Sequence, residues 1–162
     1  MKPIFGGDPH DIAPLQAMST NLPSGTVTFL FTDIEGSTPF WEREPDSMRL
    51  ALDLHHAILR QAIETHQGRI FKIVGDAFLS AFPLSSQAVE AAVAAQRQFA
   101  AQTWPTSAPV RVRMGIHIGP AVTEGSDYVT THTLNRVARI MAAARGGQIL
   151  LSLEVSDLMR AA

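Results

Sequence analysis

Cysteine is absent from the 162-residue sequence. Its absence excludes disulfide frameworks, thiolate-bound zinc and thiol nucleophiles, so any metal ligand must be an oxygen or an imidazole. A chain without cysteine also fits a reducing compartment, and we expect a cytoplasmic protein.

Strong charge of one sign and long apolar runs are missing as well. The formal net charge is −2, and no basic run is present. No overall field would therefore draw the chain to nucleic acid or to an anionic membrane, and any phosphate must be bound locally. No stretch of about 20 apolar residues and no apolar signal-peptide core occurs. We expect neither nucleic acid nor a membrane as a partner.

The remaining composition is that of one compact domain. The chain is 46% apolar and 17% charged, which is ordinary for a protein with a buried core. Residues 1–24 are polar and irregular, and we expect a flexible N-terminal tail there. Met1 and Met18 both remain open as the true start. The domain itself is expected over residues 25–162.

Local patterns predict alternating strands and helices. Residues 26–33 are β-branched and aromatic and predict a strand ending on Asp33. The following Gly36-Ser37-Thr38-Pro39 predicts a helix start with Ser or Thr as the cap, and its free amides should attract phosphate. The other expected helices cover about 47–66 (ended by Gly68), 85–102 (capped by Ser85 or Ser86), 133–144 and the residues from 153. The other expected strands are 69–74, 77–82, 110–118 (turned by Gly119-Pro120) and 148–151.

This order predicts an α+β sandwich with a ferredoxin-like core and helices on one face of an antiparallel-rich sheet. Asp33 then lies at a strand end, and Asp76 lies at the tip of a hairpin. Two such carboxylates, with the carbonyl of Ile34, suit a magnesium site. The alternative is that each aspartate only caps a turn. His55, His56 and His117 have no carboxylate at a metal-binding spacing and are interpreted as packing or surface residues.

Five segments resemble, in order, the motifs of the class III adenylyl/guanylyl cyclase catalytic domain. They are Phe-Thr-Asp-Ile-Glu-Gly-Ser-Thr (31–38), Lys-Ile-Val-Gly-Asp-Ala-Phe (72–78), Arg-Met-Gly-Ile-His-Ile-Gly (113–119), Leu-Asn-Arg-Val-Ala-Arg (134–139) and Gly-Gly-Gln-Ile-Leu-Leu-Ser (146–152). The resemblance runs from about Thr26 to Ser152. It implies a nucleotide cyclase that converts ATP, with GTP as the less favoured alternative substrate, to the 3′,5′-cyclic monophosphate and pyrophosphate in intracellular signalling, at a site with two metal ions.

The resemblance also implies roles for single residues. Asp33 and Asp76 would bind two Mg²⁺ or Mn²⁺ ions, and Lys72 would contact the purine. Asn135 and Arg139 would act on the transition state, and their i, i+4 spacing places them on one helix face. An amide can orient the ribose while a guanidinium stabilises charge on the reacting phosphate. A strand arginine that contacts the triphosphate in relatives corresponds to Arg113, and an exposed strand arginine is the alternative.

The match is weaker in one loop. Relatives place a second purine-binding residue, often Asp, seven positions before the Asn, and that position here is Tyr128. Asp127 stands one residue too early, and residues 128–133 lack the usual Gly. Thr130, Thr131 or Thr133 could supply the missing hydrogen bond, and of these we expect Thr131 to be the substrate contact. The choice between ATP and GTP remains open.

The resemblance implies a homodimer in which the metal carboxylates of one subunit face Lys72, Asn135 and Arg139 of the other. The family domain continues into closing strands, so we expect the C-terminal strands to be missing here and regulatory domains to be fused or associated. A catalytically silent module that binds nucleotide or dimerises remains the alternative. A diguanylate cyclase is disfavoured, because no Gly-Gly-[Asp/Glu]-Glu-Phe hairpin occurs around Gly75-Asp76.

Overall fold

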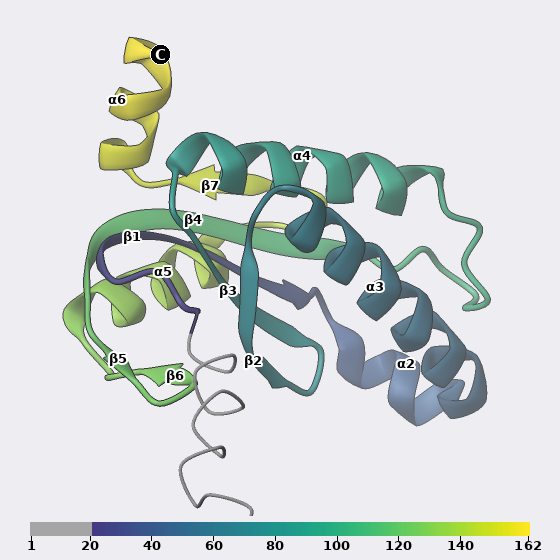
Figure 1. Cartoon of the computed structure of the whole chain (residues 1–162). Coiled ribbons are helices and arrows are strands. Elements are labelled where there is room, and N and C mark those ends of the chain that lie inside the picture. The colour runs from purple at the N-terminus through teal and green to yellow at the C-terminus, as the bar shows by residue number, and fades with distance from the viewer. Residues whose placement is uncertain (1–20) are drawn as a thin grey trace, which may run out of the picture.

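The structure, a computed structural model, describes residues 21–162. Its centre is a five-stranded sheet with the order β2-β3-β1-β4-β7 (Figure 1). The strands are β1 (Gly25–Ile34), β2 (Arg69–Val74), β3 (Ala77–Phe82), β4 (Val112–Ala121) and β7 (Ile149–Leu151). Neighbours are antiparallel except β4 and β7, which are parallel. The ferredoxin-like α+β fold with an antiparallel-rich sheet is confirmed, while residues 1–20 of the predicted tail lie outside the described residues.

The central strand β1 buries both of its faces. Its side chains alternate, as the pleat of a strand requires. Phe29 and Phe31 belong to a buried cluster on one face, whereas Leu30 and Ile34 belong to a larger cluster on the other. By the same period of two, the side chain of Asp33 lies on the face of Phe29 and Phe31.

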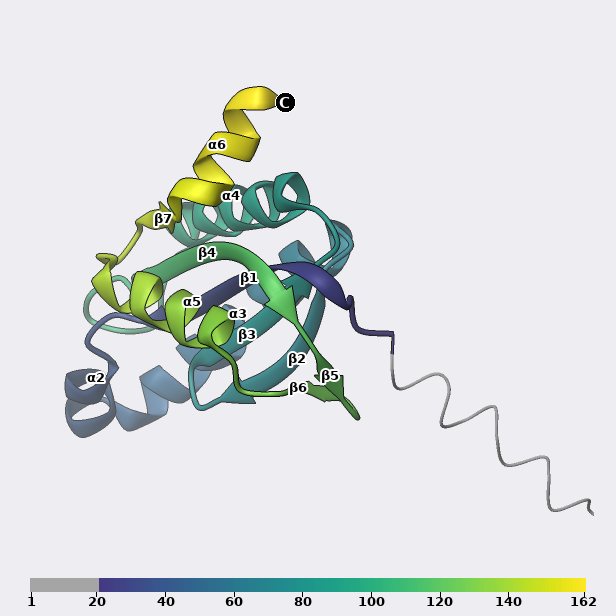
Figure 2. The same ribbon diagram turned by 90° about the vertical axis from the view of Figure 1, so that its left-hand side faces the viewer.

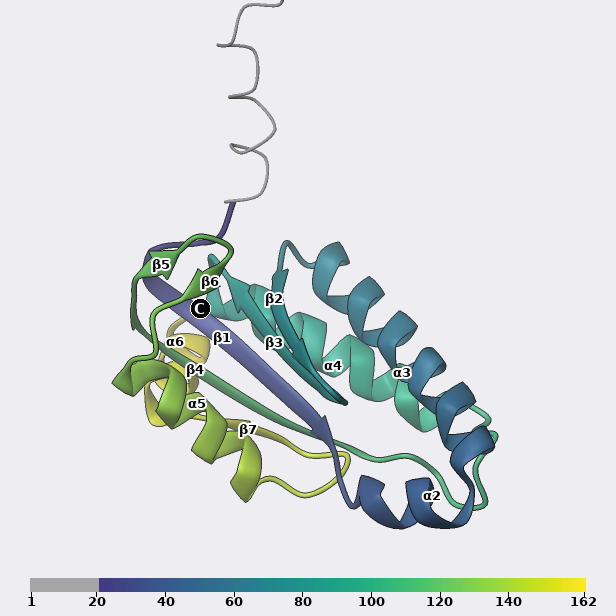
Figure 3. The same cartoon turned by 90° about the horizontal axis from the view of Figure 1, so that it is seen from below.

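Helices cover both faces of this sheet (Figures 2 and 3). The helices α3 (Pro45–Thr65) and α4 (Ser85–Ala101) pack on the face of Leu30, and α5 (His132–Ala143) packs on the face of Phe29. The short α2 (Ser37–Arg43) joins β1 to α3, and α6 (Leu153–Ala161) lies beside α4 (Figure 1). The expectation of helices on a single face is therefore wrong.

Two glycines of β4 explain how α5 reaches the sheet. A Cβ atom on Gly115 would lie 2.5 Å from the backbone nitrogen of Met141, and one on Gly119 would lie 2.6 Å from the Oγ1 atom of Thr133. Both contacts are closer than atoms can approach, so only glycine permits this packing. The Thr133 hydroxyl also donates to the carbonyl of Pro120 at 2.8 Å. The glycine spacing of β4 thus sets the position of α5.

The strand β4 is longer than predicted. Gly119 and Pro120 pair with Val27 and Thr26 of β1 instead of turning the chain. The chain turns only after Ala121, where the two-residue strands β5 (Thr123–Glu124) and β6 (Asp127–Tyr128) form a small hairpin. Pro120 is tolerated because it lies near the end of the ladder, where a missing amide hydrogen costs little.

The helix ends also differ from the expected caps. At the start of α4 the backbone amide of Leu84 donates to the Gln87 side chain at 3.2 Å, while the predicted cap Ser85 contacts the Thr28 hydroxyl instead. At the end of α3 the left-handed residue is Gln67, with a φ of 66°, and not Gly68. Gly68 is needed for space, because a Cβ atom there would lie 2.4 Å from the ring of Phe82.

Among residues 21–162, no helix is both long enough and apolar enough to cross a membrane. The helix α3 is the longest at 21 residues, but its apolar side chains form one stripe that faces the sheet.

One histidine of that stripe is part of the core. His55 is fully buried, stacks on Phe99, and its Nε2 atom has no hydrogen-bond partner among the described residues. Its Nδ1 atom lies 3.0 Å from that of His56. Burial, and secondarily the charge of His56, lowers the pKa of His55 to about 3. The interpretation of His55 as a packing residue is confirmed.

We predict that His55 makes the folded protein less stable as the pH falls. The folded protein keeps His55 neutral, whereas the unfolded chain binds a proton below about pH 6.5. Stability should therefore decrease as the pH falls from 7 towards 3, and His55 alone should contribute a loss of about 2 kcal/mol between pH 7 and pH 5. Urea denaturation of the wild type and of His55→Leu at both pH values measures this. An equal loss in the two proteins would contradict the assignment.

Candidate active site

Two aspartates meet at one end of β1. Asp33 is the penultimate residue of β1, and Asp76 lies in the turn between β2 and β3. Because Thr32 pairs with Phe78 of β3, this turn reaches the end of β1. The backbone amide of Ile34 donates to the Oδ2 atom of Asp76 at 3.3 Å. The sheet therefore brings together the two carboxylates that the sequence places 43 positions apart.

The electrostatics of Asp76 reflect this proximity. Burial raises the pKa of Asp76, and the neighbouring charge of Asp33 raises it further. The amide of Ile34 and the hydroxyl of Ser37 lower the pKa in part, because both donate to the carboxylate. Two close carboxylates, one of them partly buried and without an ion-pair partner among residues 21–162, form a site that a divalent cation would stabilise.

Asp33 has a cationic partner in Arg113. The two residues are directly opposed in the pairing of β1 with β4. The Nε atom of Arg113 donates to Oδ1 of Asp33 at 2.7 Å, and an Nη atom donates to Oδ2 at 2.6 Å. These hydrogen bonds raise the pKa of the Arg113 guanidinium. The pair is largely buried, with 17% of the Asp33 side chain and 27% of the Arg113 side chain exposed.

The donor set fits a hard divalent cation. Mg²⁺ and Mn²⁺ prefer oxygen ligands, and two carboxylates leave further positions for substrate phosphates. Among the described residues no group of three or more His, Cys, Asp or Glu side chains could bind a metal, so any such site here has two carboxylates at most. The carbonyl of Ile34, the residue that follows Asp33 and whose amide donates to Asp76, stays a predicted third ligand.

The predicted phosphate loop follows Asp33 directly. Gly36 adopts a left-handed conformation with a φ of 59° and is itself the cap of α2, without a side-chain hydrogen bond. The expectation of a Ser or Thr cap is therefore wrong at this helix too. The Ser37 hydroxyl instead lies near Asp76 and lowers the pKa of that carboxyl, and Thr38 is exposed. Contact of Gly36, Ser37 and Thr38 with phosphate stays a prediction.

Asn135 and Arg139 lie on the exposed side of α5. Val137 and Thr133 are the buried residues of this helix. Neither Asn135 nor Arg139 makes a side-chain hydrogen bond or ion pair with another residue in the 21–162 range. The intervening Arg136 donates twice to Glu154 of α6, with the shorter contact at 2.9 Å. The single chain therefore presents Asn135 and Arg139 to solvent and does not join them to Asp33 or Asp76.

Lys72 contacts a residue that sequence reasoning set aside. Its Nζ atom lies 3.4 Å from Oδ2 of Asp127, on the β5–β6 hairpin. Both side chains are about half exposed, so the pair is accessible to a ligand. Counting seven positions back from Asn135 gives Tyr128 and misses Asp127. Asp127 could have been identified from its position two residues after Gly125, since a glycine there is typical of a tight turn that exposes the neighbouring side chains.

Tyr128 is a core residue. Its ring packs edge-on against Phe29 and Phe71, and its hydroxyl donates to the carbonyl of Pro23 at 2.6 Å. Burial raises the pKa of Tyr128 to about 12. Thr133 is likewise occupied with Pro120, whereas the Oγ1 atom of Thr131 is buried without a partner among the described residues. Of the threonines predicted to contact substrate, Thr131 therefore keeps a free hydroxyl.

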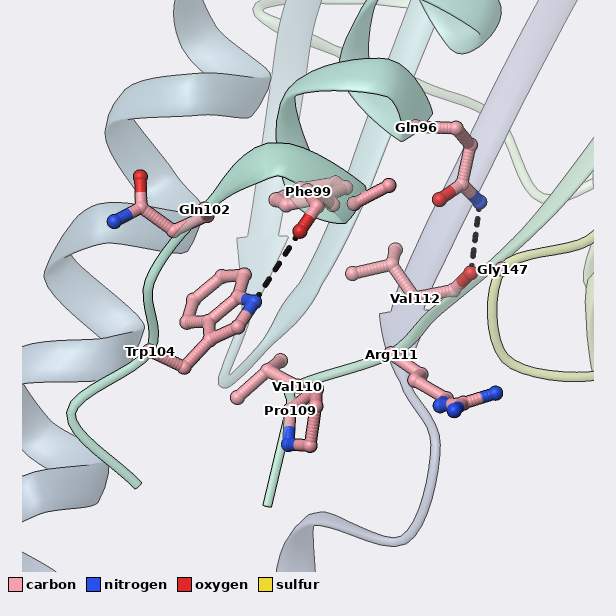
Figure 4. A pocket seen from close by; sticks show the side chains of 10 residues that line it. Gln96, Phe99, Gln102, Trp104, Pro109, Val110, Arg111, Val112 and Gly147 are labelled. Carbon is pink, nitrogen blue, oxygen red and sulfur yellow. Dashed lines mark hydrogen bonds between the residues drawn. The ribbon is translucent and has the colours of Figure 1, made fainter. Parts of the chain in front are cut away.

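A pocket of about 390 Å³ lies away from these residues, between the end of α4 and the start of β4 (Figure 4). None of the predicted site residues lines it. Two of its polar groups are bonded to the chain itself: Gln96 donates to the carbonyl of Val112 at 2.8 Å, and Trp104 donates to that of Phe99 at 3.3 Å (Figure 4). This hollow is thus not where the carboxylates converge.

Comparison with known proteins gives consistent matches. A family model described as the adenylate and guanylate cyclase catalytic domain matches residues 20–162. An adenylate cyclase of Lachancea kluyveri is 34% identical over an alignment of 155 residues, and the match covers 80% of this chain and 8% of that protein. An uncharacterized protein of Mycobacterium tuberculosis is 37% identical over 140 residues, 85% of this chain and 46% of that protein. The chain thus spans less than half of these relatives.

Among solved structures, an adenylate cyclase of Trypanosoma brucei in its monomeric state superimposes with a TM-score of 0.73 at 28% identity. The match covers 85% of this chain and 81% of that one. The arrangement of sheet and helices is therefore shared with that structure over most of both chains.

We predict that Tyr128 contributes to stability and that Asp127 does not. Tyr128→Phe removes a buried hydrogen bond and should lower the free energy of unfolding by about 1 kcal/mol. The matched change Asp127→Asn removes the exposed ion pair with Lys72, while the amide oxygen can still accept the 2.7 Å hydrogen bond from the Tyr128 backbone amide, so it should cost less than about 0.5 kcal/mol. Urea denaturation measures both. A larger loss for Asp127→Asn than for Tyr128→Phe would reverse the two assignments.

Proposed function

The chain belongs to the adenylate and guanylate cyclase catalytic domain family, and from this premise we propose that it converts ATP to 3′,5′-cyclic AMP and pyrophosphate at a site shared by two copies of the chain. The convergence of Asp33 and Asp76 at the end of β1 carries this proposal. The relative from Lachancea kluyveri, named an adenylate cyclase, supports the same activity.

In this proposal Asp33, Asp76 and the carbonyl of Ile34 bind two Mg²⁺ or Mn²⁺ ions. Bound there, the ions would activate the ribose 3′-hydroxyl and neutralise charge on the departing pyrophosphate. Ser37 and the amide of Ile34 orient the Asp76 carboxylate. The phosphates are contacted by Gly36, Ser37 and Thr38, which begin three residues after Asp33. Arg113 contacts the triphosphate from β4.

Asn135 and Arg139 complete the site from a second copy. Their side chains are exposed and without partners in the described chain, as expected of groups that act across an interface. The Asn135 amide orients the ribose. The Arg139 guanidinium is always charged and stabilises the charge that develops on the α-phosphate as the 3′-oxygen attacks and pyrophosphate leaves. A twofold dimer would contain two such sites.

The pair of Lys72 and Asp127 favours adenine over guanine. Adenine presents an acceptor at N1 and a donor at N6, which match the Lys72 ammonium and the Asp127 carboxylate. Guanine in the same orientation presents a donor at N1 and an acceptor at O6, so both contacts would be repulsive. The free hydroxyl of Thr131 is available for a further hydrogen bond.

We predict that two inactive variants restore activity when they are mixed. Asp33→Ala and Arg139→Ala should each lower Mn²⁺-dependent cyclic AMP formation at least about 10²-fold, because each removes charge stabilisation from both sites. After subunit exchange, half of the dimers would combine one variant of each kind and regain one intact site. The mixture should therefore recover about a quarter of wild-type activity.

Product formation after mixing is measured by chromatography, with each variant alone as the control. Mixed proteins that stay as inactive as the separate variants, while the wild type is active, would place the whole site in one chain. An inactive wild type that nevertheless binds ATP would favour a catalytically silent module. The ion pair between Arg113 and Asp33 is the observation that favours a silent module.

We also predict that Asp127 determines the purine. Asp127→Ala should lower kcat/KM for ATP by about 10- to 100-fold, because a hydrogen bond to a charged group is lost. The repulsion against guanine O6 is lost at the same time, so the preference for ATP over GTP should fall. Glu124→Ala, on the paired position of the same hairpin, is the matched control. An unchanged ratio in Asp127→Ala would exclude Asp127 from purine contact.

A further inference from the structure

The ion pair between Asp33 and Arg113 is built into the sheet. The two residues are directly opposed on the central strands β1 and β4, so their backbones are fixed by the ladder on either side. Both oxygens of Asp33 accept a hydrogen bond, at 2.7 and 2.6 Å, in the parallel geometry of a guanidinium fork. The pair is therefore well formed without any ligand.

The same pair neutralises one of the two metal carboxylates. A guanidinium does not lose its proton in proteins, so Arg113 stays cationic at every pH of interest. Asp76 differs, since within residues 21–162 its carboxylate forms no ion pair, and the amide of Ile34 that donates to it is neutral. Asp33 is thus the carboxylate whose charge is already compensated.

A divalent cation and the guanidinium compete for Asp33. Both approach the same two oxygens, and two cations held within about 4 Å of each other in a partly buried site repel strongly. Arg113 must therefore move away from Asp33 before a cation can bind there tightly. A triphosphate would draw Arg113 away from Asp33, because phosphate oxygens, like those of a carboxylate, accept bidentate hydrogen bonds from arginine.

We propose that Arg113 is a positioning residue that keeps Asp33 unavailable to a divalent cation until a nucleoside triphosphate takes over its guanidinium. Cation and nucleotide then bind cooperatively, because each removes a contact that opposes the other. This inference rests on the proposed function, in which Asp33 is a metal ligand. Both carboxylates come from one chain, so the effect does not require a dimer.

Mn²⁺ binding to the nucleotide-free protein tests the proposal. Free Mn²⁺ is measured by electron paramagnetic resonance during titration of the wild type, Arg113→Met and the double variant Asp33→Asn/Arg113→Met. Arg113→Met should bind Mn²⁺ about tenfold more tightly than the wild type, equal to about 1.4 kcal/mol. The double variant should lose this gain. Arg113→Lys, which keeps the charge but not the fork, should lie between the two.

Thermal denaturation provides a second measurement on the same proteins. Arg113→Met leaves the carboxylate of Asp33 without its counter-ion and should lower Tm. Added Mn²⁺ should then raise Tm more in Arg113→Met than in the wild type, because it binds only the folded state. If Arg113→Met does not fold, the comparison of Arg113→Lys with the wild type decides in the same way.

The outcomes separate this inference from the proposed function. Equal Mn²⁺ affinity in the wild type and the Arg113 variants, lost on Asp33→Asn, would overturn the role of Arg113 and retain the metal site. Mn²⁺ affinity that does not depend on Asp33 in any protein would overturn the metal site, and the role of Arg113 with it. Tighter binding in Arg113→Met that depends on Asp33 would support both.

Discussion

The antiparallel pairing of β1 with β3 and β4 is the constraint on which the site depends. Pairing with β3 brings the turn that carries Asp76 to the end of β1, and pairing with β4 sets Arg113 opposite Asp33. A slip of one residue in either ladder would move Asp33 to the other face of the sheet. The aromatic residues of β1 prevent that slip, because a slip would move their side chains out of the buried cluster around Tyr128.

The two faces of the sheet have different tasks. The face of α3 and α4 contains the larger apolar cluster, which includes four fully buried alanines of α4. The face of α5 contains the smaller cluster and all the charged pairs that the proposed reaction uses. Gly115 and Gly119 allow α5 to approach β4 closely, so the exposed Asn135 and Arg139 are mounted on a helix with little freedom to shift.

Sequence patterns predicted most elements of the fold, because strand and helix periods are local properties. The hairpin around Asp76 and the helices α3 to α6 agree with the prediction within a few residues. The placement of α5 could not be predicted in this way, since it depends on the absence of side chains on a distant strand. The contacts of Asp33 with Arg113 and of Lys72 with Asp127 also join distant residues, and only a known strand pairing reveals them.

Tyr128 has a consequence for how the β5–β6 loop is compared between relatives. Its ring is anchored against Phe29 and Phe71, so the residue just before it is directed towards Lys72 whatever the distance to α5 along the chain. The loop between the tyrosine and the helix can therefore gain or lose residues without displacing Asp127. In such chains the acid that we propose to contact the base is better located by counting from the buried aromatic residue than from the helix, because the spacing to the helix can vary.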